Sequence, residues 1–452
     1  MAHLAHDPDA RPDGRSANDL KAVMPLTAEL RDGELYVGGV STVELAREFG
    51  TALYVYDEEH IRERLATWLR ELRAVLPQAD VAYAGKAFTC KAMVRLLAEA
   101  GAHLDVSSGG ELAIALAAGF PAERVVVHGN NKSERELTEA IEAGAGLIVV
   151  DCFEELERVN RLAGGRGVVQ PILLRIKPGV VADTHEYIRT GAEDSKFGFG
   201  LSDGAALQAV EQALALPHCD LRGLHAHIGS QIYALESFAE TLRVLAAFLA
   251  ELRASTGFVA RDLNLGGGVG IAYLADDEPP QIAQFAAIVA ETLKAACREH
   301  DLPLPRLLVE PGRSIVAGAG LTLYTVGSIK KLLDLRTYVA VDGGMTDNIR
   351  VALYGARYES VIASRADAPR DALVTLAGKH CESGDVVAID ASLQSPRVGD
   401  VICMFATGAY GHSMASNYNR QVRPGVVFVR DGRAREVLRR ETYADLLNCE
   451  TD

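Results

Sequence analysis

Between about residue 50 and residue 312, short hydrophobic runs alternate with longer runs rich in Ala, Leu and Glu. The short runs have the length of strands and the longer runs have the composition of helices, so the pattern predicts repeated strand-helix units on a parallel sheet. Several short runs are continuous in Val, Ile and Leu, which is typical of strands buried on both faces. The nine candidate strands are TALYVYD (51–57), VAYAGKA (81–87), HLDVSS (103–108), RVVVHGN (124–130), LIVVDC (147–152), ILLRIKP (172–178), LRGLHAHIGS (221–230), DLNLGGG (262–268) and RLLVEPG (306–312).

Nine candidates leave two architectures open. A closed (β/α)8 barrel uses eight strands and places one outside, whereas an open doubly wound sheet can use a different number. We expect the barrel, with residues 51–57 outside it, because polar residues recur at the carboxyl ends of the runs. In a barrel these ends form the one face on which the active site is built. The residues are Lys86, Ser107, His128, Asn130, Asp151, Lys177, His227, Ser230, Gly266 and Glu310.

After residue 313 the pattern changes to strand-like runs without long helices between them, punctuated by Gly-Asp and Asp-Gly pairs. This change predicts a second, mostly antiparallel β domain, a barrel or sandwich. The segment GELYVGGV (33–40) has the same character. We therefore expect an α/β protein with four parts: a disordered N-terminal tail (1–24), a segment joining the β domain (25–50), the barrel (51–312) and the β domain (313–452).

Charge and cysteine content narrow the function classes. The formal net charge is −15, from 46 Lys and Arg against 61 Asp and Glu, which disfavours binding to nucleic acid or an anionic membrane surface. The seven cysteines form no CxxC pair, which indicates a reducing compartment. The sequence has no apolar run of about 18 residues and no signal-peptide core. We expect a cytoplasmic enzyme without nucleic-acid or membrane partners.

Lys86 and Glu310 stand at strand ends and have specific chemistry. A partly desolvated lysine can form an imine with an aldehyde, although a solvated strand-end lysine is the alternative for Lys86. Glu310 is followed by Pro311, which turns the chain and keeps the carboxylate at the strand end. A carboxylate there can keep a pyridine nitrogen protonated, or it can pair with an arginine such as Arg313.

Two glycine-containing loops, HIGSQ (227–231) and LGGGVGI (265–271), follow strands and can bind a phosphate through backbone N–H groups. Neither is a Walker A loop, and each can equally be a tight turn. His227 can lie against a planar cofactor, and His225 faces the same side of the strand and lies deeper. A buried structural role remains open for both histidines. No constellation of ligands compels a metal, so we expect none.

Two further polar segments lie in the predicted β domain. Cys381 belongs to GKHCESGD (378–385), where Lys379 and His380 can lower the pKa of its thiol and make it a proton donor or nucleophile. An inert buried thiol is the alternative. The loop TGAYGHSMASNYN (407–419) is unusually long and polar for a β domain, and such loops are commonly functional.

These motifs, in this order, resemble the diaminopimelate decarboxylase family, within the fold group shared by ornithine and arginine decarboxylases and alanine racemase. The resemblance covers roughly residues 33–445. It is carried by GTALYVYDE, YAGKAF, DVSSGGEL, HGNNKS, THEYIRTGAEDSKFGF (184–199), HAHIGSQ, NLGGGVGI, VEPGRSI, VDGGMTDNIR, ALYGARY, GKHCESGD and TGAYGHSMASNYN.

The resemblance implies that pyridoxal 5'-phosphate is the cofactor, joined covalently to Lys86, with His227 against its ring and Glu310 at its pyridine nitrogen. It also implies that Cys381 returns a proton to the decarboxylated carbon. The cofactor is further expected at Gly229, Ser230, Gly266, Gly267, Gly268, Arg313 and Tyr410, and the substrate at Arg313, Arg350, Tyr354, Glu382 and Tyr410.

The implied reaction is decarboxylation of meso-2,6-diaminopimelate to L-lysine and CO2, the last step of lysine biosynthesis. The implied assembly is a homodimer in which Cys381 and Glu382 of one subunit serve the site of the other. Two alternatives stay open: a pyridoxal-dependent decarboxylase of another basic or carrier-bound amino acid, and a non-enzymatic pyridoxal phosphate carrier. The CESGD pattern argues against the ornithine type, and the attached β domain argues against the carrier. A racemase is disfavoured because Glu310 supports a strong electron sink.

Overall fold

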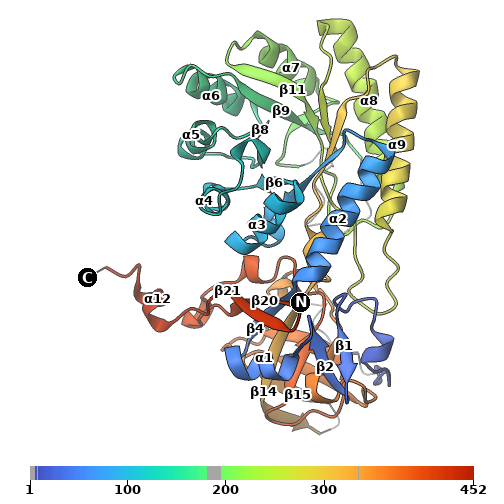
Figure 1. The fold of residues 1–452 in the computed structure, drawn as a ribbon, viewed down its shortest axis with the longest axis vertical. Helices are drawn as coiled ribbons and strands as arrows, with labels where there is room; N and C mark the ends of the chain where they lie inside the picture. The colour runs from blue at the N-terminus through green and yellow to red at the C-terminus, as the bar shows by residue number, and fades with distance from the viewer. Residues whose placement is uncertain (1–5, 8, 181–194, 334, 452) are drawn as a thin grey trace. The chain divides into compact units, whose positions relative to one another are not determined.

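The computed structural model describes residues 6–7, 9–180, 195–333 and 335–451. Contacts divide the chain into two compact units (Figure 1). The barrel unit comprises Leu65–Gly270 and Pro279–Gly312, and the β unit comprises Met1–Arg64, Ile271–Glu278 and Arg313–Asp452. The barrel unit thus begins after residue 64, whereas the sequence placed its start at residue 51.

The barrel unit contains a closed ring of eight parallel strands, as the sequence predicted. The ring closes because β13 pairs with β5 and β8 pairs with β9, and the two-residue strand β10 (Phe199–Gly200) lies beside β9. In ring order the strands are β5 (Asp80–Ala84), β6 (His103–Val106), β7 (Val125–Val127), β8 (Leu147–Val150), β9 (Gln170–Lys177), β11 (Cys219–His225), β12 (Asp262–Asn264) and β13 (Arg306–Val309).

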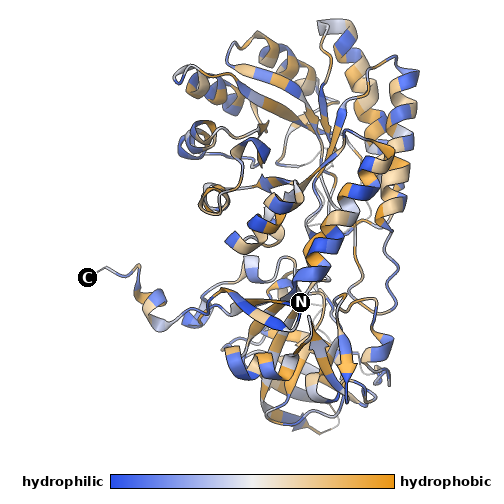
Figure 2. Ribbon diagram, viewed as in Figure 1, coloured by the Kyte–Doolittle hydropathy of each residue, from blue (hydrophilic) through white to orange (hydrophobic). Residues whose placement is uncertain are grey.

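Helices follow the strands in alternation and lie outside the ring (Figure 1). Hydrophobic residues gather on the strands and on one side of the helices (Figure 2), because each helix buries one stripe against the sheet. The helices are α3 (Lys91–Ala100), α4 (Gly109–Ala117), α5 (Glu134–Ala143), α6 (Phe153–Gly164), α7 (Ala205–Ala215), α8 (Glu236–Thr256) and α9 (Ile282–Glu299), while α2 (Glu58–Val75) spans the point where the chain enters the barrel unit.

The interior of the ring is filled by side chains and is therefore a core and not a channel. Beyond this core, the parallel direction of the strands brings their carboxyl ends to one face. The chain segments that carry Lys86, His227 and Glu310 follow β5, β11 and β13 at this face. The buried core residues are Ala82, Val126, Leu147, Val149, Leu173 and Leu308.

The β unit is built on a nine-stranded, mostly antiparallel sheet, in which only the pairs β15–β17 and β4–β20 are parallel. β16 is a short strand that the sequence pattern did not predict. The sheet consists of β4 (Leu53–Asp57), β14 (Gly320–Leu332), β15 (Arg336–Val341), β16 (Ser360–Ile362), β17 (Ala372–Ala377), β18 (Val386–Leu393), β19 (Val401–Met404), β20 (Gly425–Arg430) and β21 (Arg433–Leu438). Its short helices are α10 (Arg313–Val316), α11 (Arg350–Tyr354) and α12 (Tyr443–Leu447).

The segment TALYVYD was predicted to lie outside the barrel, and it does. β4 pairs with β14 and β20 of the β unit, and all five of its side chains are buried there. These pairings give residues 51–64 their place in the β unit, because a strand with partners on both sides belongs to the sheet that supplies them.

The predicted N-terminal tail is in large part folded. Ser16 caps a short helical turn, Ala17–Asp19, and Leu20 and Val23 are buried in the core of the β unit. The same core contains Leu35 from a small sheet formed by β1 (Glu29–Arg31), β2 (Glu34–Val37) and β3 (Val40–Ser41), which is followed by α1 (Thr42–Phe49). The polar composition of residues 1–24 hid these spaced apolar side chains. Residues 1–5 and 8 lie outside the described part of the chain.

Among the described residues, no helix combines the length and the apolar character that crossing a bilayer requires.

Candidate active site

A buried carboxylate, Glu310, lies at the centre of the carboxyl face of the barrel. Its Oε1 atom is 2.7 Å from His128 Nε2 and accepts a hydrogen bond of 2.7 Å from Asn264 Nδ2. Its Oε2 atom is 3.2 Å from His225 Nε2. Four strands supply these groups. His225 and Asn264 are the last residues of β11 and β12, and His128 and Glu310 come directly after β7 and β13.

The charge of this cluster is set by its own members. Burial opposes ionisation of Glu310, but the charge of His128 and the hydrogen bonds from His128 and His225 hold the pKa of Glu310 well below its usual range. Burial works against protonation of His128 as well, yet Asp105 and Glu310 raise the pKa of His128. Burial lowers the pKa of His225 to about 4, so that its ring is neutral. The cluster therefore contains a carboxylate paired with His128, whose protonated form is favoured, and two neutral donors, His225 and Asn264.

The ligand atoms of His128, His225 and Glu310 lie within 4.8 Å of one another, a spacing that also suits a metal ion. The sequence analysis found no constellation of ligands that compels a metal, and it did not find this group. The hydrogen bonds within the cluster already use both oxygens of Glu310 and the Nε2 atoms of both histidines. We therefore assign the cluster an electrostatic role.

Lys86 lies in a single 3-10 turn, Gly85–Ala87, directly after β5, and its side chain is exposed. The turn needs a glycine before the lysine, because a Cβ atom on Gly85 would lie 2.8 Å from the carbonyl oxygen of Asp105. Burial and the nearby charge of Lys86 lower the pKa of His227 well below its usual value, so the His227 ring is neutral. His227 Nδ1 accepts a hydrogen bond of 3.2 Å from the backbone N–H of Gly267, which fixes the orientation of the ring.

The glycines of the loop after β12 let the loop backbone lie closer to neighbouring carbonyl oxygens than a residue with a side chain would allow. A Cβ atom on Gly267 would lie 2.0 Å from the Glu310 carbonyl oxygen, and one on Gly268 would lie 2.3 Å from that of Gly229. The N–H groups of Gly266 and Gly267 already donate to Asn264 Oδ1 at 2.9 Å and to His227 Nδ1 at 3.2 Å. These two bonds fix the conformation of the loop, and phosphate binding by Gly266, Gly267 and Gly268 stays a prediction.

The residues of the barrel face fit a pyridoxal cofactor. Glu310 is a stable carboxylate for a pyridinium nitrogen, and Lys86, an exposed residue directly after β5, carries an amine that can react with an aldehyde. The neutral ring of His227 is held in one orientation near Lys86. Phosphate binding by the loops that contain Gly229 and Ser230 and the three glycines after β12 remains a prediction.

In the β unit, two buried arginines are surrounded by tyrosine rings. Arg313 donates to the Tyr273 hydroxyl, and its guanidinium carbon lies 4.9 Å from the centroid of the Tyr410 ring. The guanidinium carbon of Arg350 lies 5.3 Å from the centroid of Tyr273 and 5.9 Å from those of Tyr354 and Tyr410. The structure thus brings together four residues that the sequence assigned to substrate or cofactor, and it adds Tyr273, which the sequence did not indicate.

The electrostatics of this cluster favour an anion. Although burial acts in the opposite direction, Arg313 and Arg350 lower the pKa of Tyr273. Burial likewise works against the charge of Arg350, but the phenol groups of Tyr358 and Tyr273 raise the pKa of Arg350, so it stays charged. Within the described part of the chain, the buried Nε atom of Arg350 has no hydrogen-bond partner. A carboxylate brought by a ligand would complete this environment.

Cys381 is exposed in the loop between β17 and β18. Its backbone N–H donates to Asn419 Oδ1 at 3.2 Å, and Glu382 Oε2 accepts from the Tyr418 hydroxyl at 2.8 Å. The two polar segments that the sequence singled out separately, 378–385 and 407–419, are therefore joined in space. His380 Nδ1 lies 2.9 Å from Asp385 Oδ2, which fixes the base of the Cys381 loop.

Sequence reasoning missed the roles of His128, Asn264 and Tyr273. His128 was noted only as a polar strand end, and a weak signal for Asn264 was available in its place beside the glycine loop. Tyr273 had no signal in the sequence. Most of the segment 184–199, which contributed to the family resemblance, lies outside the described residues.

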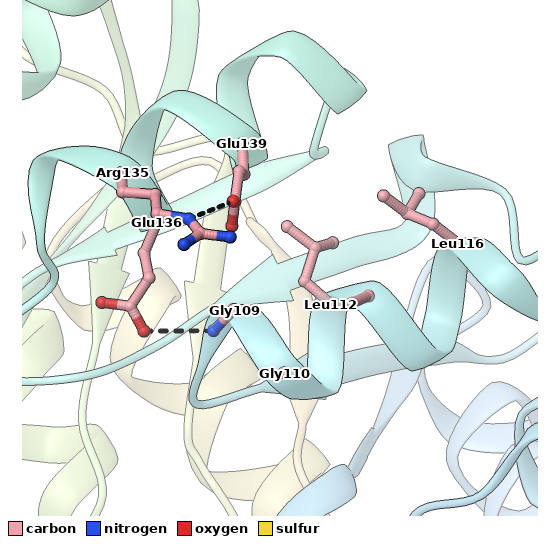
Figure 3. A pocket seen from close by; sticks show the side chains of 8 residues that line it. Gly109, Gly110, Leu112, Leu116, Arg135, Glu136 and Glu139 are labelled. Atoms are coloured by element: carbon pink, nitrogen blue, oxygen red, sulfur yellow. Dashed lines mark hydrogen bonds and ion pairs between the residues drawn. The ribbon is translucent and has the colours of Figure 1, made fainter. Parts of the chain in front are cut away.

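A separate hollow of about 450 Å³ lies between α4 and α5 of the barrel unit and shares no residue with the predicted site (Figure 3). Its polar contacts are an exposed pair between Arg135 and Glu139 and a bond of 3.1 Å from the Gly109 N–H to Glu136. These contacts are typical of helix ends and surfaces, so the hollow has a structural explanation.

Residues 58–317 match the family described as "Pyridoxal-dependent decarboxylase, pyridoxal binding domain". This match contains the ring of strands and the residues from Lys86 to Arg313. The class that the fold and the barrel site define is therefore that of the pyridoxal-dependent decarboxylases.

Relatives along nearly the whole chain narrow this class. The chain is 49% identical over 418 residues to the diaminopimelate decarboxylase of Bacillus subtilis (strain 168), covering 92% of this chain and 95% of that protein. It is 45% identical over 429 residues to the diaminopimelate decarboxylase of Mycobacterium bovis, with 92% and 95% covered. A crystal structure of the M. jannaschii diaminopimelate decarboxylase in complex with L-lysine superposes with a TM-score of 0.88 at 36% identity, covering 94% of this chain and 98% of that chain. The chain belongs to the diaminopimelate decarboxylase family.

Proposed function

We propose that this protein removes the α-carboxyl group of meso-diaminopimelate to give L-lysine and CO2, with pyridoxal 5'-phosphate as its cofactor. The observation that carries the proposal is the buried Glu310 carboxylate, kept ionised by His128, at the end of a strand that pairs with the strand preceding Lys86. Membership of the family, and the complex of a relative with L-lysine, support the choice of substrate and product.

Lys86 would hold the cofactor through its aldehyde, Glu310 would keep a proton on the pyridine nitrogen, and His227 would support the ring. When bound, the cofactor supplies an electron sink for the electron pair that remains when CO2 leaves. Glu310 serves this chemistry because its charge is already formed in the folded protein and needs no reorganisation during the reaction.

The substrate residues of the proposal lie in the β unit. Arg313 and Arg350 would bind a carboxylate through the guanidinium fork. The rings of Tyr410 and Tyr354 would hold these guanidinium groups in place through cation-π contacts. Glu382 would bind the distal ammonium by a charge-assisted hydrogen bond. A distal carboxylate paired with a distal ammonium distinguishes diaminopimelate from its product.

Cys381 would donate the proton that replaces the carboxyl group on the substrate carbon. We include in the proposal a homodimer in which Cys381 and Glu382 of each subunit serve the barrel of the other, and a cytoplasmic, reducing setting. The exposure of the Cys381 thiol supports both the proton transfer and the sharing. A forced monomer would then be inactive.

Two measurements test the proposal. Mass spectrometry of the borohydride-reduced holoprotein should locate the cofactor adduct on Lys86, and the purified holoprotein should release CO2 from meso-diaminopimelate faster than from the LL isomer. An adduct on another residue would overturn the assignment of the barrel site. Activity on ornithine without activity on meso-diaminopimelate would favour another amino acid decarboxylase, and a yellow protein that releases no CO2 from any diamino acid would favour the carrier.

A further inference from the structure

The N-terminal arm, defined here as residues 9–20, crosses the β unit and is bound to it through its backbone. The N–H of Gly14 donates to the carbonyl oxygen of Arg370 at 3.2 Å, and the N–H of Arg370 donates to that of Arg15 at 2.8 Å. The N–H of Ala17 donates to Ala366 at 2.8 Å. These bonds hold the carboxylate of Asp13 in a fixed place.

Asp13 forms an ion pair with Arg370, a fully buried arginine that is 1% exposed. Arg370 Nε donates to Asp13 Oδ1 at 3.1 Å, and its NH1 group donates to Glu359 Oε2 at 2.6 Å. The other oxygen of Glu359 accepts the backbone N–H of Ala275 at 3.2 Å. A continuous line of charged contacts therefore leads from the arm to the loop Ile271–Glu278.

Arg15 makes a second connection from the arm to the same loop, because its NH2 group lies 2.9 Å from Asp276. Inside the loop, Asp277 accepts the backbone N–H of Tyr273 at 2.9 Å. The Tyr273 ring in turn packs edge-on against Tyr358, with the centroids 5.5 Å apart. Both connections thus converge on the residue that contacts the two buried arginines of the candidate site.

The arm reaches this loop through polar contacts as well as through apolar packing, since Ala17 and Leu20 share a buried hydrophobic cluster with Ala272. A cavity of about 670 Å³ lies between the arm and the sheet, and its lining includes Asp13, Arg15, Asp276, Tyr358 and Glu359.

We propose that Asp13 and Arg370 are positioning residues: through Glu359 they fix the loop Ile271–Glu278, and with it Tyr273, so that Arg313 and Arg350 face the substrate carboxylate. This inference rests on the proposed function, which gives these two arginines that ligand. Without Asp13, Arg370 retains a buried charge and competes with Ala275 for Glu359, and the loop loosens.

The test compares Asp13→Ala with wild type, both as holoenzymes. We expect KM for meso-diaminopimelate to rise about tenfold while kcat stays within about twofold, since uniform binding is lost and the chemical step is intact. Asp9→Ala, which removes an exposed carboxylate of the same arm, is the matched control and should behave like wild type. Asp13→Glu should restore most of the affinity because it returns the charge.

Hydrogen exchange provides a readout that does not depend on turnover. In Asp13→Ala the amides of Tyr273 and Ala275 should exchange faster, while amides of β20 remain protected. If KM and loop protection stay at wild-type values while only the melting temperature falls, the arm is merely structural and the inference is wrong. An equal effect of Asp9→Ala would overturn it as well.

Should Asp13→Ala fail to fold, Arg15→Ala carries the test, because its pair with Asp276 is partly exposed and its loss is tolerable. We expect KM to rise about two- to threefold with this variant, in keeping with a partly exposed ion pair, and an unchanged KM would overturn the inference. Failure of the proposed function is seen separately, as a wild-type protein that releases no CO2 from meso-diaminopimelate.

Discussion

The two clusters of buried charge solve the same physical problem in opposite ways. In the barrel unit, the Glu310 carboxylate is compensated within the protein by His128, His225 and Asn264. In the β unit, Arg313 and Arg350 are buried among phenol rings, and within the described part of the chain the Nε atom of Arg350 lacks a partner. A compensated charge is ready before any ligand arrives, whereas a cationic cluster that lacks a carboxylate is completed by an anionic ligand.

The supports of the two clusters differ as well. The barrel groups stand at or directly after the ends of paired strands, where backbone hydrogen bonds fix their position. The arginines open two short helices, α10 and α11, and Tyr273 lies in a loop. Groups on strands are held more tightly than groups on loops, so we expect the β unit to adapt to the substrate while the barrel stays unchanged.

The largest effect of a single substitution is expected at Glu310. Replacement by Gln keeps the shape and removes the charge, so kcat should fall by about a hundred- to a thousandfold, the scale of losing a preorganised charge. The melting temperature of the apoenzyme should fall too, because His128 loses its ion-pair partner in a buried site. Steady-state kinetics and thermal unfolding measure both effects. A variant with kcat within tenfold of wild type would show that the Glu310 carboxylate does not keep the pyridine nitrogen of the cofactor protonated.

Replacing Arg350 should lower activity without lowering stability, in contrast to the replacement of Glu310. Arg350→Met should lower kcat/KM about a hundredfold, mainly through KM, because a buried charge-assisted contact to the substrate is lost. Its apoenzyme should melt at the same or a higher temperature than wild type, since an incompletely paired buried cation has been removed. Arg350→Lys, which keeps the charge without the fork, is the control and should recover little of the affinity. A melting temperature lowered as far as in Glu310→Gln would contradict the comparison.

The pH dependence of the stability of the apoenzyme tests the internal charge compensation of the Glu310 cluster. The folded-state pKa of His128 is raised, so its stabilising contribution is complete below its ordinary value of about 6.5 and is lost as the pH rises through the raised pKa. The pKa of Glu310 is lowered, so its contribution is complete above about 4.5 and is lost as the pH falls through the lowered pKa. We expect unfolding scans of wild type to show a loss of stability on the alkaline side, and His128→Gln to flatten it. An identical slope in the variant would count against the ion pair.

The smallest effect is expected at Tyr273. Tyr273→Phe removes the hydroxyl that accepts from Arg313 but keeps the ring beside both arginines, so KM should rise only about two- to fivefold, as for one modest hydrogen bond. Tyr273→Ala also removes the cation-π contact and should have a larger effect. Kinetics of the two variants side by side separate the hydroxyl from the ring, and equal values for both would show that the ring contributes nothing.

Sequence patterns predicted more of the fold than of the site. All eight barrel strands were found because continuous Val, Ile and Leu runs alternate with helical segments, and β4 was correctly left outside. β16, a strand of three residues in the β unit, was missed. The folded part of the N-terminal tail was missed because Leu20 and Val23 are spaced within a polar stretch.

What the sequence determined by itself is the set of local signals: strand ends with Lys86, His227 and Glu310, glycines where loops approach closely, and the order of the family motifs. What only the tertiary structure decided is which side chains share one charge environment, such as His128 with Glu310, or Asp13 with Arg370 more than 300 residues away. The physical reason is that charge compensation and pKa depend on distance and burial in space. Local periodicity carries information on the secondary structure of a segment and none on the partner that its side chains meet.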